Sequence, residues 1–150
     1  MLKIGDKAPD FTLMNQHGQK IQLASFLGQR VIVYFYSKDN TSGCTKEACS
    51  FRDHYPAYLE KGIVVIGISP NDEKSHARFS EQHALPFILL SDLDRTVIQA
   101  FGAWGEKKSY GKTYMGLIRS TFVIDEQGKI EKVWAKVNTA THGRDVLDSL

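Results

Sequence analysis

Two uninterrupted apolar runs do most to constrain how this chain can fold. Val31–Tyr36 and Ile63–Ser69 are rich in β-branched and aromatic residues and do not alternate with charged ones. Runs of this kind are typical of strands that are buried on both faces, in sheets that helices cover on each side. Because helical stretches separate these runs from the other strand candidates, the pattern predicts an α/β layer fold.

Shorter elements complete this alternation. Two hairpins are expected where strand candidates flank the turn residues Asn15–Gly18 and Glu126–Gly128. The expected strands are Phe11–Leu13, Lys20–Leu23, Phe87–Leu90, Thr121–Asp125 and Lys129–Trp134. The expected helices are Asn71–His83, Asp92–Phe101 and a short one from Thr141. Asn71 is the expected N-cap of the first of these helices, and Asp92 and Asp94 suit the N-terminus of the second.

Length and composition exclude several classes of protein. With 150 residues, of which 42% are hydrophobic and 24% charged, the chain is expected to form one domain over 1–150 and is not disordered, collagenous or a coiled coil. Its net charge of +2 does not point to nucleic acid or an anionic membrane as a partner. No apolar run approaches the roughly 20 residues of a membrane span, and the N-terminus carries no signal sequence. We therefore expect a cytoplasmic protein, in which cysteines serve chemistry rather than structural disulfides.

The segment after the first buried run is the most informative part of the chain. From Cys44 onward, apolar side chains recur in steps of four and three residues and trace one helix face, although Pro56 should kink or interrupt this helix. Ser37–Gly43 then forms a polar loop between the end of a buried strand and the N-terminus of a helix. In open α/β sheets, ligands bind at this edge.

The two cysteines of this segment differ in position. Cys44 lies in the first turn of the predicted helix, where the helix N-terminus favours a thiolate; the alternative is a buried and inert cysteine. Cys49 follows five residues later. On an intact helix the two Cα atoms would be about 8–9 Å apart, beyond the roughly 7 Å limit for a disulfide. The spacing predicts either no disulfide or one that requires local unwinding.

Other chemical interpretations are weaker. The spacing of Cys44, Cys49 and His54 scatters their side chains around a helix, so no metal site is expected. A thioredoxin-type C-x-x-C is absent. The glycines and lysine of 105–113 are one residue too far apart for a phosphate-binding loop, which favours a glycine-rich polar connection. His76 and His83 are interpreted as solvated helix positions.

Two charged residues have both a functional and a structural interpretation. Arg119 begins a strand that is expected to be buried, where a guanidinium needs an anionic partner or a ligand; otherwise it is a surface arginine. Glu47 lies about one turn after Cys44 and either orients an arginine or simply favours the start of the helix.

Several segments together resemble one known family. One run of this chain resembles the active-site segment of peroxiredoxins, and in particular that of the peroxiredoxin Q or bacterioferritin comigratory protein branch. This run is Ser37-Lys38-Asp39-Asn40-Thr41-Ser42-Gly43-Cys44-Thr45-Lys46-Glu47-Ala48-Cys49-Ser50-Phe51-Arg52-Asp53. Three other segments also resemble the family, in the same order along the chain. Gly5–Phe11 is similar to the opening of the family, and Trp104–Lys112 and Arg119–Asp125 are similar to its later signatures. The resemblance covers nearly the whole chain.

The resemblance implies a fold and a set of site residues. The fold is a thioredoxin-like α/β sandwich with a central mixed sheet flanked by helices, here with an N-terminal β-hairpin. Within the family motif P-x-x-x-T-x-x-C, Cys44 corresponds to the peroxidatic cysteine and Thr41 to the threonine. Cys49 corresponds to the resolving cysteine of this branch, and Arg119 to the active-site arginine. The chain departs from the family at two positions that are normally proline, Ser37 and Ser42.

The resemblance also implies an activity. A Cys44 thiolate would reduce hydrogen peroxide and organic hydroperoxides, with Gly43 and Glu47 at the substrate. The resulting sulfenic acid would be resolved by Cys49 as a disulfide and recycled by thioredoxin or a similar dithiol protein. No cofactor or metal is implied, and the protein would be a monomer or weak homodimer. The alternatives are a non-enzymatic redox sensor or a thiol–disulfide oxidoreductase that uses the same cysteine pair.

Overall fold

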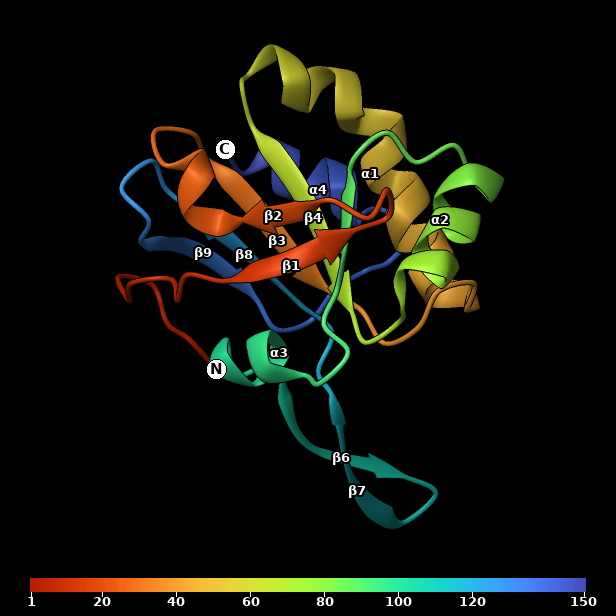
Figure 1. Ribbon diagram of the computed structural model, residues 1–150. Helices are drawn as coiled ribbons and strands as arrows, with labels where there is room; N and C mark the ends of the chain where they lie inside the picture. Colours follow the sequence, from red (N-terminus) through yellow and green to blue (C-terminus); the bar gives the residue numbers. More distant parts are fainter.

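A seven-stranded mixed sheet forms the centre of the computed structural model, which describes all of residues 1–150 (Figure 1). Its strands lie in the order β2-β1-β5-β4-β3-β8-β9. Their bounds are β1 Thr12–Asn15, β2 Lys20–Gln22, β3 Val31–Phe35, β4 Val64–Ser69, β5 Ile88–Ser91, β8 Ser120–Ile124 and β9 Ile130–Trp134. All the strands and both hairpins expected from the sequence are present, with bounds shifted by one or two residues.

The first apolar run becomes β3, an interior strand of the sheet. β3 pairs in parallel with β4 on one side and antiparallel with β8 on the other, and all its residues are buried. Its side chains alternate between two cores. Val33 and Phe35 pack into one core, to which the short helix α3 (Thr96–Ala100) and the 3-10 helix η1 (Leu23–Phe26) also contribute. Tyr34 and its neighbours on the other face pack into a second core.

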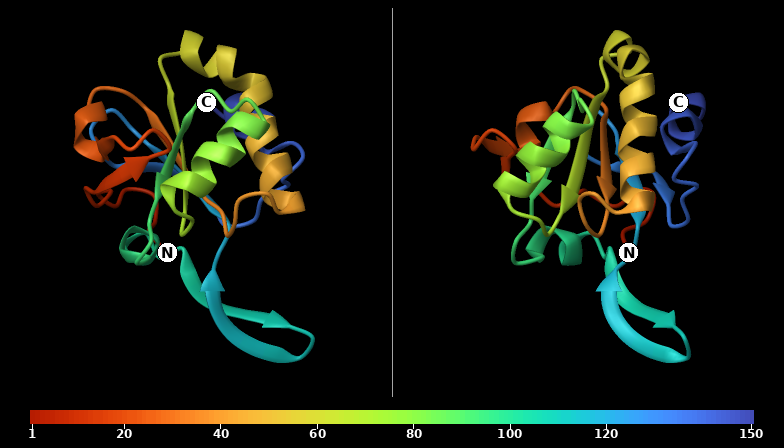
Figure 2. Two further views of the ribbon diagram at one scale, coloured as in Figure 1. Left: turned by 45° about the vertical axis from the view of Figure 1, so that its right-hand side comes forward. Right: turned by 90° about the vertical axis from the view of Figure 1, so that its right-hand side faces the viewer.

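Three helices contribute to the second core. They are α1 (Ser42–Glu60), α2 (Glu73–Gln82) and α4 (His142–Asp148), and α1 and α4 pack side by side (Figure 2). The Gly143 backbone touches α1 closely, because a Cβ there would lie 2.4 Å from the Ser50 carbonyl oxygen. None of the helices combines the length and apolar character needed to cross a bilayer.

Pro56 lies inside α1 without ending it. The sequence predicts a kink or an interruption at Pro56, and the helix is continuous from Ser42 to Glu60, so no interruption occurs. The helix axis changes direction in its second half, as the views in Figures 1 and 2 agree. A bend is the expected result of a proline that lacks an N–H and crowds the preceding turn.

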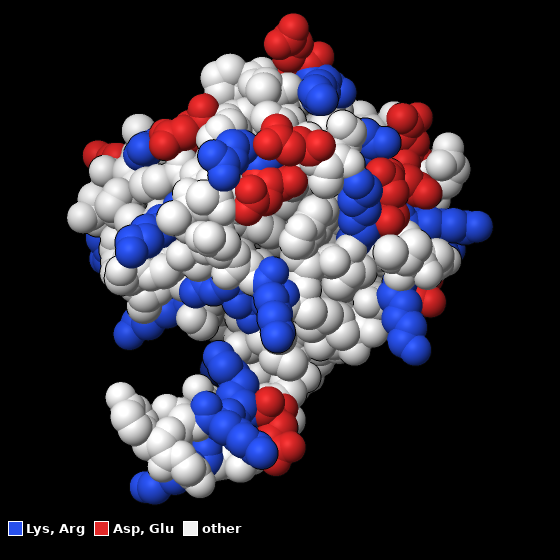
Figure 3. All heavy atoms as spheres, turned by 180° about the vertical axis from the view of Figure 1, so that it is seen from behind, with Lys and Arg blue, Asp and Glu red and all other residues white.

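The glycine-rich segment after α3, which was expected to be a polar connection, forms a β-hairpin. β6 (Trp104–Ser109) and β7 (Lys112–Leu117) pair antiparallel and project from the body of the molecule (Figure 2). Tyr110 and Gly111 form the turn with φ of 50° and 75°, as a two-residue hairpin turn requires. Lysines gather on this projection (Figure 3). Because little of the hairpin reaches the core, its sequence lacks the apolar alternation that marks a half-buried strand.

Two helix starts differ from their predictions. α2 begins at Glu73, and its N-cap is Asp72, whose carboxylate accepts a bond from the Ser75 N–H, rather than Asn71. α3 begins only at Thr96, four residues later than predicted. Asp92 and Asp94 nevertheless accept bonds from N–H groups of this helix. Their predicted capping role is confirmed.

Candidate active site

Cys44 lies where the interior strand β3 is followed by α1, the longest helix. β3 ends at Phe35, and Ser37–Thr41 form a short loop before α1 begins at Ser42. Thr41 is the N-cap residue, with extended backbone. The Cys44 side chain is thus held in the first helical turn and is only 1% exposed. Unpaired N–H groups at a helix N-terminus stabilise an anion at this place.

Strand pairing brings Arg119 to the same point. Because β8 runs antiparallel to β3 with Ser120 opposite Phe35, the residue before Ser120 lies beside the residues that follow Phe35. The Arg119 guanidinium donates from Nη2 to Cys44 Sγ at 3.1 Å and from Nη1 to Glu47 Oε1 at 2.6 Å. The half-buried arginine therefore has the anionic partner that its position requires, and the interpretation as a surface arginine is wrong.

The charges of this group perturb one another. Burial opposes ionisation of Cys44, but the Thr41 hydroxyl, the Lys38 backbone N–H and the Arg119 guanidinium together hold the pKa of its thiol below the ordinary value. Burial raises the pKa of Glu47 to about 7, against the opposing effect of Arg119. The site thus favours a thiolate at Cys44 and holds a proton loosely at Glu47.

Small residues surround the sulfur on the loop side. Thr41 Oγ1 lies 2.9 Å from the Lys38 carbonyl. Its single hydrogen can be donated either to that oxygen or to the Cys44 thiolate. A Cβ on Gly43 would lie 3.4 Å from Arg119 Nη2, so the glycine leaves room beside the guanidinium. Ser37 Oγ lies 3.8 Å from Cys44 Sγ.

Cys49 is half-buried, and both cysteines are free thiols. Because α1 is continuous through both residues, their spacing keeps them out of disulfide range in this conformation. The helix is also fastened directly after Cys49. Ser50 Oγ accepts from the Gly143 N–H at 2.8 Å, and the Tyr58 hydroxyl donates to the Gly143 carbonyl at 2.6 Å.

Other histidines and cysteines do not assemble a second reactive centre. No group of three or more potential metal ligands is present, and His54 Nδ1 lies 2.9 Å from the Ser50 carbonyl. His76 is completely buried, so its prediction as a solvated position is wrong; His83 is half-buried, with Nε2 3.3 Å from Asn40 Oδ1.

The sequence reasoning missed the pairing of His76 with Asp39, whose atoms Nδ1 and Oδ2 lie 2.7 Å apart. One signal was available. His76 precedes Phe79 by three residues and therefore shares the face of α2 that packs on the core. The partner could not be identified in this way, because Asp39 comes from a loop 37 residues earlier.

Comparisons with known proteins identify the family of this chain. Residues 4–133 match the AhpC/TSA family. Peroxiredoxin Bcp of Bacillus subtilis is 44% identical over 149 residues, which cover 99% of this chain and 95% of that protein. Peroxiredoxin Bcp of Escherichia coli K12 is 47% identical over 149 residues, covering 99% and 96%.

Similarity to a solved structure shows the fold of the chain. The bacterioferritin comigratory protein of Xanthomonas campestris superposes with a TM-score of 0.90 at 34% identity, covering 99% of this chain and 95% of that one. This similarity confirms the thioredoxin-like α/β fold with a central mixed sheet flanked by helices.

Proposed function

The chain belongs to the AhpC/TSA family and is a thiol peroxidase of the Bcp/peroxiredoxin Q type, and from this premise we propose that Cys44 is the residue that attacks the peroxide. The observation that carries the proposal is the 3.1 Å contact between Arg119 Nη2 and Cys44 Sγ. It supplies a positive charge next to a thiol at a helix N-terminus, and this charge helps to hold the thiol pKa below its ordinary value.

In the proposed first step, the Cys44 thiolate attacks the hydroxyl oxygen of a hydroperoxide ROOH. An S–O bond forms while the O–O bond breaks, and its electron pair leaves on RO⁻, which takes a proton from water and departs as ROH. Cys44 becomes a sulfenic acid. Arg119 stabilises the negative charge as it moves from sulfur to oxygen. The Thr41 hydroxyl and the N–H groups of Gly43 and Cys44 hold the peroxide oxygens.

Glu47 is assigned the orientation of Arg119. Its Oε1 accepts the Nη1 hydrogen at 2.6 Å, which leaves Nη2 directed at the sulfur. Because Glu47 is fully buried, the guanidinium has little freedom to turn away. A bidentate arrangement of this kind needs the planar fork of arginine and is not available to lysine.

In the proposed second step, the Cys49 thiol attacks the sulfur of the Cys44 sulfenic acid. A disulfide forms and water is released. The first turns of α1 must unwind for the two sulfurs to meet. The bond between Ser50 Oγ and the Gly143 N–H supports unwinding only up to Cys49, since the helix beyond it stays fastened to α4. A dithiol protein of the thioredoxin class then supplies two electrons and restores both thiols.

The substrates we propose are hydrogen peroxide and organic hydroperoxides. The Xanthomonas campestris protein is described by its alkyl peroxide reduction activity, which supports the second group. We also propose a cytoplasmic location and a monomer or weak homodimer.

A redox sensor that uses the same cysteine pair is the second candidate function. Ser37 favours it, because a serine replaces the family's proline and its Oγ lies 3.8 Å from Cys44 Sγ.

The test is peroxide-dependent turnover with a thioredoxin system, for the wild type, Cys44→Ser and Cys49→Ser. We expect turnover in the wild type only, with a sulfenic acid that a dimedone probe traps in Cys49→Ser but not in Cys44→Ser. Turnover by Cys44→Ser would refute the assignment of the nucleophile. Normal turnover by Cys49→Ser would refute its resolving role. A disulfide that forms under peroxide without turnover would favour the sensor.

A further inference from the structure

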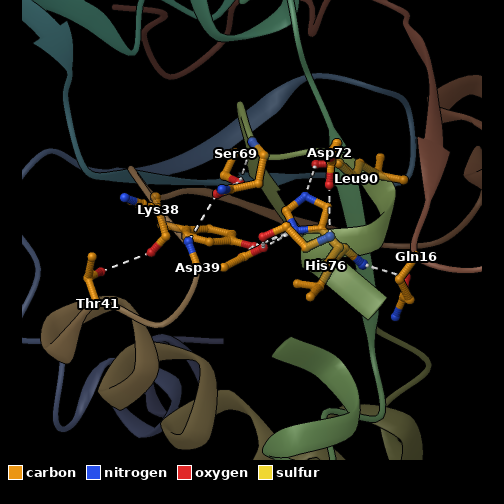
Figure 4. A network of polar contacts seen from close by, with 12 residues as sticks. Gln16, Lys38, Asp39, Thr41, Ser69, Asp72, His76 and Leu90 are labelled. Carbon is orange, nitrogen blue, oxygen red and sulfur yellow. Dashed lines mark hydrogen bonds and ion pairs between the residues drawn. The ribbon is translucent and has the colours of Figure 1, made fainter. Parts of the chain in front are cut away.

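A polar cluster is buried on the side of the active-site loop that faces α2 (Figure 4). The Asp39 carboxylate is its centre. Oδ1 accepts from the Tyr36 hydroxyl at 2.6 Å, and Oδ2 accepts from Ser75 Oγ at 2.8 Å and lies 2.7 Å from His76 Nδ1. The side chains of Asp39 and His76 are 2% and 0% exposed. No step of the proposed reaction uses this cluster.

The hydrogen-bonding capacity of His76 is fully used. Nε2 lies 2.9 Å from the Leu90 carbonyl, which can only accept, so this nitrogen donates. Burial raises the pKa of Asp39, but the bonds and charge of His76 and the two hydroxyls outweigh it and hold that pKa below its usual value. An ionised Asp39 also only accepts, so Nδ1 donates as well. His76 therefore fastens Asp39 to α2, and its other nitrogen fixes the ring against the backbone of β5.

Asp39 in turn fixes the residues on each side of it. Its own N–H donates to Asn71 Oδ1 at 3.0 Å, so the backbone as well as the side chain is held. The carbonyl of the preceding residue, Lys38, accepts from Thr41 Oγ1 at 2.9 Å, and the backbone of Lys38 contributes to the lowered pKa of Cys44. The loop can thus place Lys38 and Thr41 correctly at the sulfur only while Asp39 stays in position.

We propose that His76 is a positioning residue for the peroxidase reaction, which acts through Asp39 to hold Lys38 and Thr41 against Cys44. This inference rests on the proposed role of Cys44. A buried ion pair is a costly way to stabilise a fold, because desolvation of both charges offsets most of their attraction. We infer that this ion pair instead holds the loop before α1 in a single conformation.

Two variants of His76 separate the link to the loop from the link to the sheet. Asn at this position places an amide nitrogen where Nδ1 lies and keeps the bond to Asp39, whereas Gln reaches toward the Leu90 carbonyl and loses it. We would measure the rate of Cys44 oxidation by rapid mixing with peroxide. We would also measure the Cys44 pKa by thiolate absorbance in a Cys49→Ser background.

We expect His76→Gln to react roughly 10- to 100-fold more slowly, since small misplacements of reacting groups cost this much. We expect its Cys44 pKa to rise by about one, as the loss of one hydrogen bond to the thiolate would cause. His76→Asn should stay within about threefold of the wild type. Equal rates for the two variants, or a wild-type rate for His76→Gln, would overturn the proposal.

Asp92→Asn is the matched control. Asp92, like Asp39, is a buried aspartate, but its carboxylate accepts from the N–H of Ile98 in α3 and does not hold the loop. Asp92→Asn should lower stability and leave the oxidation rate unchanged. An equal slowing would mean that general destabilisation explains the result, and it would also overturn the proposal.

If His76→Gln does not fold, Ser75→Ala offers a second test. It removes one donor from Asp39 and should slow oxidation about threefold; no slowing would count against the proposal. If the wild type itself shows no Cys44 oxidation, the proposed function fails first.

Discussion

Two buried acid–base pairs lie on opposite sides of the loop and first turn that present Cys44, and they differ in how the acid is supported. Glu47 faces Arg119 at 2.6 Å, and Asp39 faces His76 at 2.7 Å. Both carboxylates are removed from solvent. Burial nevertheless raises the pKa of Glu47 to about 7, whereas the pKa of Asp39 is lowered.

The number of donors explains the difference. Asp39 is held by two hydroxyls in addition to its partner histidine. Glu47 has only Arg119, and its Oε2 is buried without a hydrogen-bond partner. An unsatisfied buried oxygen leaves the desolvation of the charged form uncompensated. The comparison teaches that one pair fixes the position of the loop, while the other orients a guanidinium toward the sulfur.

Loss of Arg119 should have the largest effect on the chemistry. Arg119→Met removes the positive charge at Cys44 Sγ, and we expect the rate of peroxide reduction to fall about 1000-fold, the upper range for one charge-stabilising donor. Arg119→Lys should recover only part of this rate, because an ammonium cannot reach Sγ and Glu47 together. Rapid-mixing kinetics would measure both rates. A wild-type rate in Arg119→Met would remove this pair from the mechanism.

Removal of the charge from the other pair should lower stability in addition to slowing Cys44 oxidation. Asp39→Asn turns an amide NH₂ toward groups that donate, and leaves His76 without its anion. We expect the free energy of unfolding at pH 7 to fall by about 3 kcal/mol, as for a broken buried ion pair. Since the pKa of Asp39 is lowered on folding, its contribution is present above the unfolded value and is lost as the pH falls through the folded one. Urea unfolding would measure this, and an unchanged stability at pH 7 would contradict the comparison.

Glu47 should change stability with pH in the opposite direction to Asp39, and Glu47→Gln should remove this dependence. A carboxyl whose pKa rises from 4.5 to about 7 on folding contributes stability below pH 4.5 that is lost as the pH rises toward 7. Between pH 5 and pH 8 the wild type should therefore lose about 2.5 kcal/mol more than Glu47→Gln. His142, whose pKa burial lowers to about 4, changes stability in the other direction below pH 6.5. The contribution of His142 cancels when the wild type is compared with Glu47→Gln. If the two proteins lose stability in parallel between pH 5 and pH 8, the raised pKa of Glu47 is refuted.

Local patterns were sufficient for the strands and for the position of Cys44. The apolar runs became buried strands because a continuous run has no face to present to water. The step of five residues between the cysteines correctly kept them apart on one helix. The β6–β7 hairpin was missed, since a projecting hairpin owes nothing to a core and leaves no apolar period in its sequence. Asn71 was assigned to the wrong role because Asp72, which is equally suited to capping, follows it directly.

The sequence by itself determined the layer fold, the helix N-terminus that carries Cys44, and the family to which its motifs are similar. All of these depend on residues close together in the chain. Only the tertiary structure decided which charges meet. Arg119 reaches Cys44 across 75 residues because β8 pairs with β3, and His76 reaches Asp39 because α2 packs over the end of the same strand. Such contacts depend on strand order and packing, which bring together side chains that no local period connects.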